Sequence, residues 1–66
     1  MKLLELIFVL PAFANIVIIN REKPNVSLYI GNVEEFYWIG KEYVKGEEVC
    51  SLNFNREKNY FEIVVE

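Results

Sequence analysis

The 66-residue sequence contains no histidine and no aspartate, and it has a single cysteine, Cys50. One cysteine excludes an internal disulfide. A structural zinc ion needs about four Cys, His or carboxylate ligands, and one thiol with scattered glutamates does not supply them. Without histidine, neither Cys50 nor a serine has the usual base that activates a nucleophile. We therefore expect no catalytic residues, no metal site and no bound cofactor.

Other chemical signatures are equally scarce. The three glycines, Gly31, Gly40 and Gly46, are too widely spaced to form a phosphate-binding loop. The adjacent glutamates Glu34/Glu35 and Glu47/Glu48 flank expected turns, where carboxylates are normally solvated. Seven basic residues against ten acidic ones give a net charge of −3, which argues against nucleic-acid binding. These features favour a non-catalytic binding protein.

The sequence also has no apolar run long enough to cross a bilayer. Lys2, the run 3–10 and the motif Ala12-Phe13-Ala14 do imitate a short signal peptide with its cleavage site. Glu5 interrupts the apolar region, however, and cleavage after Ala14 would remove much of the core. We expect a cytoplasmic protein that does not contact membranes.

Sixty-six residues form one domain, 1–66, with little interior. Such small domains usually gain stability from disulfides, metals or association. Only association is open to this chain, and hydrophobic residues make up 53% of it. Because two-fold dimers are the commonest assembly, we expect a homodimer.

Apolar spacing predicts the elements. Residues 2–10 are expected to form a helix that ends before Pro11, because residues that precede proline avoid the helical conformation. The β-branched run within 15–20 indicates a central strand, and the alternation in 26–30 predicts a second strand with Val26, Leu28 and Ile30 facing inward. The segment 33–46 is less regular; Asn32 and Glu35 fit a capping box for a short helix that ends at Gly40.

Two further strands, 49–54 and 60–65, flank a five-residue polar loop and form a hairpin. Alternation places one apolar set on the inner face of this hairpin, with Cys50 buried among them: Cys50, Leu52, Phe54, Phe61, Ile63 and Val65. The expected fold is α+β. One N-terminal helix packs on a four-stranded, mainly antiparallel sheet made of two hairpins, with a short helical or irregular connector between them.

Several short motifs resemble a loose group of very small phage and prophage proteins of unknown function. The matching residues are Leu3-Leu4-Glu5-Leu6, Pro11, Glu48-Val49-Cys50-Ser51 and Ile63-Val64-Val65-Glu66. Phe8, Ala12 and Phe13 depart from the group, which has more polar residues there. The resemblance implies this fold and a viral or mobile-element origin, and no activity.

Aromatic residues carry the binding hypothesis. Tyrosine and tryptophan dominate interface hot spots, because they bury a large area and keep a polar group. We expect an acidic, aromatic binding surface made of Tyr29, Glu34, Glu35, Tyr37, Trp38, Glu42, Tyr43 and Tyr60, with Tyr29, Tyr37 and Tyr60 exposed. An alternative is that Phe36 and Trp38 close one end of the core.

Three functions fit these expectations. The first is contact with a host protein complex, such as an immune effector that the chain would block. The second is an oligomeric sponge for a nucleotide-like signal, with Tyr29 or Trp38 stacking and Arg21 or Arg56 binding phosphate between subunits. The third is a structural accessory role.

Overall fold

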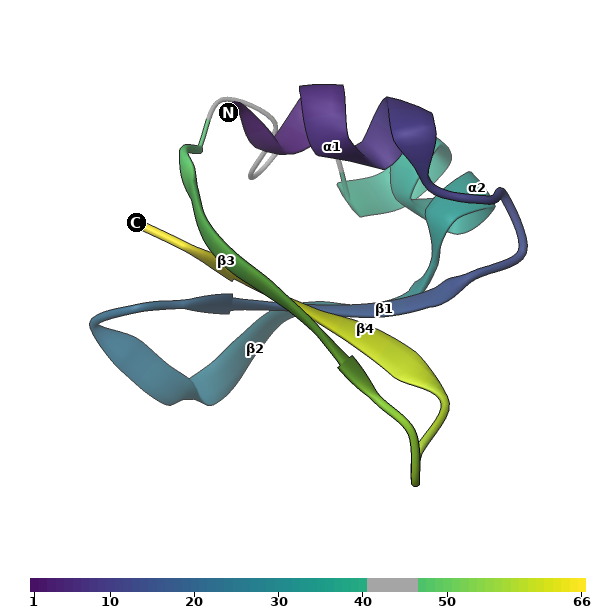
Figure 1. Ribbon diagram of the computed structural model, residues 1–66. Helices are drawn as coiled ribbons and strands as arrows, with labels where there is room; N and C mark the ends of the chain where they lie inside the picture. Colours follow the sequence, from purple (N-terminus) through teal and green to yellow (C-terminus); the bar gives the residue numbers. More distant parts are fainter. Residues whose placement is uncertain (41–46) are drawn as a thin grey trace.

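A computed structural model describes residues 1–40 and 47–66. The strands form one four-stranded sheet, and the helices lie over it as a layer (Figure 1). The elements are α1 (Leu3–Val9), β1 (Asn15–Asn20), β2 (Lys23–Asn32), α2 (Val33–Glu35), η1 (Phe36–Gly40), β3 (Val49–Asn55) and β4 (Tyr60–Val65). η1 is a π-helix that continues α2 directly. The expected α+β class is confirmed, whereas the expected connector beyond Gly40 lies outside the described residues.

The strand order is β2-β1-β4-β3, so the sheet is mixed. Both expected hairpins are present, because β1 pairs with β2 and β3 pairs with β4 in antiparallel fashion. The two hairpins meet through a parallel pairing of β1 with β4, in which Ile16 lies opposite Phe61 and Ile18 opposite Ile63. The most apolar strands therefore occupy the centre, and "mainly antiparallel" describes only the outer pairings.

The helix α1 covers one face of this sheet (Figure 1). Its buried side chains are Leu3, Leu6 and Ile7, at the spacing expected for one helix face. The side chain of Glu5 accepts the backbone N–H of Lys2 at 2.8 Å and so caps the helix start, and Pro11 follows its end. Among the residues that the structure describes, nine buried apolar residues form the core: Leu3, Leu6, Ile7, Ile16, Ile18, Val33, Phe36, Ile63 and Val65.

Asparagines shape both hairpin turns. The side chain of Asn20 accepts the backbone N–H of Glu22 at 2.8 Å, and that of Asn55 accepts the N–H of Lys58 at 3.0 Å. Asn59 has a left-handed backbone with φ of 56°, a conformation that asparagine tolerates better than most residues. The first turn is tighter than expected, so β2 begins at Lys23 and includes Pro24. Proline is acceptable there because β2 is an edge strand.

The inward orientation of Val26, Leu28 and Ile30 is wrong. In the regular part of the β1–β2 pairing, Tyr29 lies opposite the buried Ile18 and Ile30 lies opposite Val17. Beyond Ile18 the register shifts at a bulge that contains Leu28, so that Ser27 lies opposite Ile19. The regular pairing therefore places Tyr29 on the core face with Ile18, and Ile30 on the other face with Val17. Val26, Leu28 and Ile30 are exposed instead, with Ile30 70% exposed. Alternation alone does not show which of the two faces of a strand is covered, nor where an extra residue interrupts the pattern.

The burial of Cys50 is also wrong: its side chain is exposed. Val49 pairs with Val65 and Ser51 with Val64, so Cys50 is the extra residue of a bulge. Beyond it, Leu52 and Phe54 do share a face with Ile63 and Phe61, as expected. They nevertheless remain 40% and 49% exposed, so the inner face of the hairpin extends past the packed core.

Candidate functional site

Half of the predicted binding surface comes together on the helical layer. Glu34 and Glu35 are exposed on α2, and Trp38 on η1 is 81% exposed. Tyr37 is half-buried, and its ring lies 5.7 Å from that of Phe8 on α1. We call these five residues, Phe8, Glu34, Glu35, Tyr37 and Trp38, the aromatic–acidic patch.

The other predicted residues lie elsewhere. Tyr29 is half-buried on the core face, so its expected exposure is wrong. Tyr60, also half-buried, lies on the opposite face of the sheet, where it lines a small recess with Val17 and Ile30. Glu42 and Tyr43 fall outside the described residues. The sheet therefore separates Tyr60 from the patch.

Backbone hydrogen bonds fix the position of the patch. Asn32 caps α2 as expected, since its side chain accepts the N–H of Glu35 at 2.7 Å. The two residues before Glu35 have partners outside the helix: the N–H groups of Val33 and Glu34 donate to the carbonyls of Ala14 and Ala12 at 3.0 Å each. All three N–H groups that begin this helix are therefore satisfied, and the loop after α1 is tied to the patch.

Two aromatic residues support the helix from below. Phe36 is fully buried, and its ring meets that of Tyr29 edge-on at 5.2 Å. The hydroxyl of Tyr29 donates to the backbone carbonyl of Asn32 at 2.8 Å. Burial, and secondarily the charge of Glu35, raises the pKa of Tyr29, which keeps this hydroxyl protonated as a donor. The alternative expectation was that Phe36 and Trp38 close one end of the core. Phe36 does so, whereas Trp38 is exposed.

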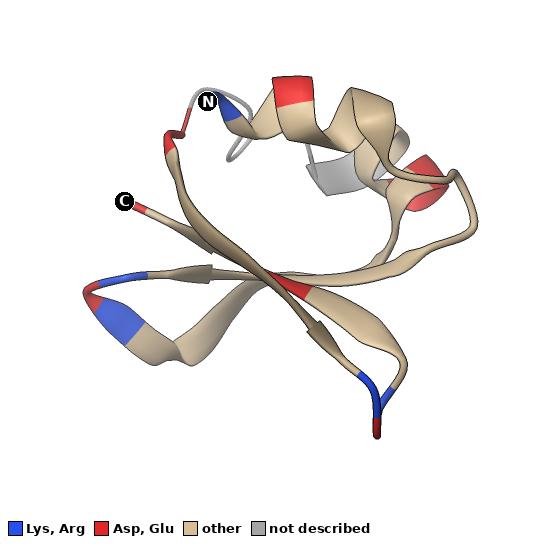
Figure 2. Ribbon diagram, in the orientation of Figure 1, with Lys and Arg blue, Asp and Glu red and all other residues tan. Residues whose placement is uncertain are grey.

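Exposed charges gather in two regions, the helical layer and the hairpin ends. Figure 2 shows acidic residues on the helical side, where Glu5, Glu34 and Glu35 are exposed. Arg21, Lys23, Arg56 and Lys58 lie at the hairpin ends, which extend away from the helices (Figure 2) and also carry Glu22 and Glu57, while Lys2 lies at the start of α1. Within one chain, Trp38 on η1 and the arginines of the hypothetical nucleotide sponge therefore lie in different parts of the molecule.

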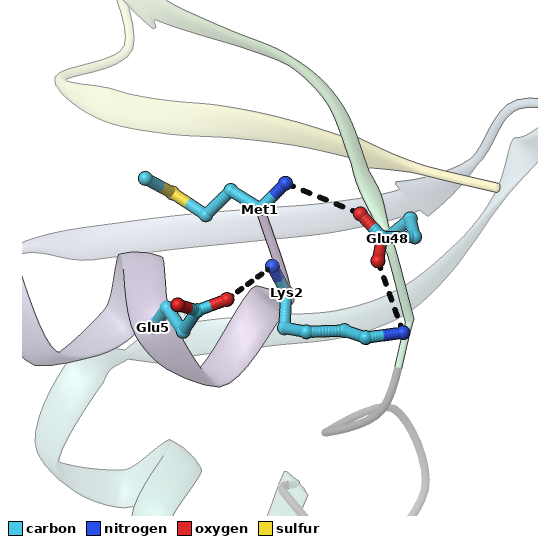
Figure 3. Close-up of polar contacts among 4 residues, drawn as sticks. All are labelled: Met1, Lys2, Glu5 and Glu48. Carbon is cyan, nitrogen blue, oxygen red and sulfur yellow. Dashed lines mark hydrogen bonds and ion pairs between the residues drawn. The ribbon is translucent and has the colours of Figure 1, made fainter.

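A cluster of charges joins the chain start to β3. One carboxylate oxygen of Glu48 lies 3.1 Å from the Met1 ammonium, and the other lies 3.0 Å from the Lys2 ammonium (Figure 3). Lys2 first and the N-terminal ammonium second lower the pKa of Glu48, while Glu48 raises the pKa of Lys2. Both side chains are about half-exposed, and backbone bonds from Leu3 to Glu47 and from Val49 to Met1 reinforce the junction. The cluster is structural and offers no open reactive group.

Sequence reasoning missed one feature, an apolar pocket with a volume of about 290 Å³. The loop after α1 forms one wall and the β3–β4 hairpin forms the other. Its lining comprises Pro11, Phe13, Ala14, Asn15, Phe54, Asn59 and Phe61. The unusual apolar residue Phe13, which is 83% exposed, was the available signal, but only the fold brings it to the hairpin.

Within residues 1–40 and 47–66, no group of three thiol or carboxylate side chains gathers in a way that could hold a metal ion. No helix within the described ranges is long and apolar enough to cross a membrane.

Comparison with protein-family models, curated proteins and solved structures finds no match for this chain. The resemblance to small phage proteins stays a prediction.

Proposed function

We propose that this chain is a non-catalytic binding protein that contacts a partner protein through the aromatic–acidic patch. The exposure of Trp38 carries the proposal. The only tryptophan of the chain is 81% exposed on a helix whose neighbouring positions are capped and packed. An exposed tryptophan is the residue type that most often supplies binding energy at the centre of an interface.

The charges of the patch define the partner. Glu34 and Glu35 are exposed on the turn that precedes Trp38. Their carboxylates would complement a lysine- or arginine-rich surface and accelerate the encounter at low salt. The resemblance to phage proteins would make that partner a host protein, and a counter-defence role follows from the same prediction.

The deciding experiment compares partner capture by the wild type, Trp38→Ala and Phe13→Ala. The tag is placed at the C-terminus, because the Met1 ammonium contacts Glu48 (Figure 3). Both replaced rings are more than 80% exposed, so both variants should fold. We expect one captured protein to be lost with Trp38→Ala, retained with Phe13→Ala, and released as salt rises. Equal capture by the wild type and Trp38→Ala would contradict the proposal.

The proposal includes self-association through the sheet face that the described helices leave open, here called the outer face. Strand register places four apolar side chains on it: Val17, Ile19, Ile30 and Val64. Light scattering should report a dimer for the wild type and for Trp38→Ala, and a monomer for Ile30→Glu. A monomeric wild type would overturn this part of the proposal and leave the patch untouched.

A further inference from the structure

We infer that the apolar pocket between the α1–β1 loop and the β3–β4 hairpin binds a single flat, uncharged aromatic heterocycle, the chemistry of a nucleobase. The site is separate from the aromatic–acidic patch and does not depend on the proposed partner. Three properties of the pocket, its rings, its carboxamides and its neutrality, support this assignment.

The first of these properties is the set of aromatic rings that line the pocket. Phe54 and Phe61 share a sheet face, with ring centroids 4.9 Å apart and planes tilted by 55°. Phe61 packs against the core, whereas Phe54 remains 49% exposed and Phe13, on the opposite wall, 83% exposed. A concave site lined by incompletely covered rings favours an occupant with a π-face of its own.

The polar lining restricts the occupant further. Asn15 and Asn59 are the only residues among those that line the pocket with side chains able to form hydrogen bonds. Each carboxamide has both a donor and an acceptor, and an asparagine pairs in two-point fashion with the edge of adenine. Neither carboxamide hydrogen-bonds to any other residue in the described part of the chain, so both are available to a ligand.

Charge and size exclude other ligand classes. None of the seven lining residues is charged, which leaves no ion partner for an anionic or cationic group inside the pocket. A volume of about 290 Å³ lies at the lower end of the range for small-molecule sites, roughly 300–1,000 Å³, and suits one ring system. A purely apolar ring would fit the walls and leave both carboxamides unused.

The test is a titration of the ¹⁵N-labelled protein with adenosine, followed by NMR. We expect saturable shifts of the side-chain amide signals of Asn15 and Asn59. Phe13→Ala should weaken binding by roughly 5- to 150-fold, the usual effect of losing one stacking ring. Asn59→Gly should also weaken it, because glycine keeps the left-handed backbone at this position and removes only the carboxamide.

The controls separate this site from the other proposals. Trp38→Ala should bind adenosine like the wild type. Toluene, a ring without a hydrogen-bonding edge, should bind more weakly than adenosine. The inference is overturned if adenosine gives no saturable shift, if Phe13→Ala or Asn59→Gly binds it unchanged, or if toluene binds as tightly. Adenosine binding that Trp38→Ala abolishes would move the site to the patch and would likewise overturn it.

Discussion

Replacement of Gly31 by alanine is expected to destabilise the protein, because the added methyl group would overlap the ring of Tyr29. A Cβ atom built at this position lies 2.6 Å from the hydroxyl oxygen of Tyr29, 2.9 Å from its Cζ and 3.4 Å from its Cε2. The first two distances are shorter than real contacts allow. Either the tyrosine or the strand must move.

Two effects of opposite sign decide the magnitude. The φ angle of Gly31 is not positive, so alanine fits the backbone and gains about 0.4–1 kcal/mol by restricting the unfolded chain. Overpacking costs about 1–3 kcal/mol. The ring of Tyr29 cannot yield easily, because its hydroxyl is bonded to Asn32 and its ring packs on Phe36. The steric effect should be the larger of the two, so Gly31→Ala should lower the free energy of unfolding by about 1–2 kcal/mol.

The assay is urea unfolding at one fixed protein concentration, since association would change the apparent stability. A double-mutant cycle with Tyr29→Val isolates the cause. In the Tyr29→Val background the clash is absent, and Gly31→Ala should be neutral or stabilising. Stabilisation by Gly31→Ala alone, or a coupling free energy below about 0.5 kcal/mol, would refute the reasoning.

Three other predictions follow from burial and charge. Phe36→Ala should lower the free energy of unfolding by about 3–5 kcal/mol, when a chain of this length has a total of about 3–10 kcal/mol. Trp38→Ala should lower it by less than about 0.5 kcal/mol, as measured by urea unfolding. The thiol of Cys50 should react with Ellman's reagent as fast in native buffer as in urea; protection in native buffer would contradict its exposure. The ion pairs of Glu48 should stabilise the protein above the usual pKa of a glutamate, and this stability should be lost as pH falls through the lowered pKa of Glu48 in the folded state. The reason is that Glu48 binds a proton more readily in the unfolded chain. As pH is lowered, the urea midpoint should therefore fall less steeply for Glu48→Gln than for the wild type, and high salt should reduce the difference between the two proteins. Identical pH dependence in both proteins would show that the ion pairs of Glu48 do not contribute to stability.

Local signals explain the parts of the fold that could be predicted. Pro11 and the spacing of Leu3, Leu6 and Ile7 act within a few residues, and so does the cap of Asn32 on Glu35. The hairpin of β3 and β4 is likewise set by two adjacent apolar strands and a polar turn. Each depends on neighbours in the sequence, and each is confirmed.

The errors come from contacts between distant segments. Nothing near 15–20 or 60–65 specifies that β1 and β4 pair in parallel. The bulges at Leu28 and Cys50 are settled by the fit of whole strands. At Tyr29 the deciding partners are the ring of Phe36 and the carbonyl of Asn32, which become neighbours only after α2 forms.

The candidate sites show the same limit. The sequence identified the aromatic cluster, but the alternative in which both Phe36 and Trp38 close one end of the core is right for Phe36 and wrong for Trp38. They lie two positions apart on one helical segment, hence on different sides of it, and only the sheet below determines which side is covered. The pocket could not be predicted from the sequence, because the residues of its two walls are about 40 positions apart in the chain.

The two surfaces of the proposed function lie on opposite sides of the sheet, and this arrangement has a consequence for stoichiometry. Association through the outer face would bury Ile30 and leave Trp38 of each subunit pointing away from the interface. A two-fold dimer of this kind presents two identical patches, so it would bind two partner molecules or bridge two sites on one assembly. Bridging raises the effective affinity without any new contact. Ile30→Glu should then weaken capture of a multimeric partner while leaving one-to-one binding unchanged, a result that a structural role for Ile30 within a single subunit would not produce.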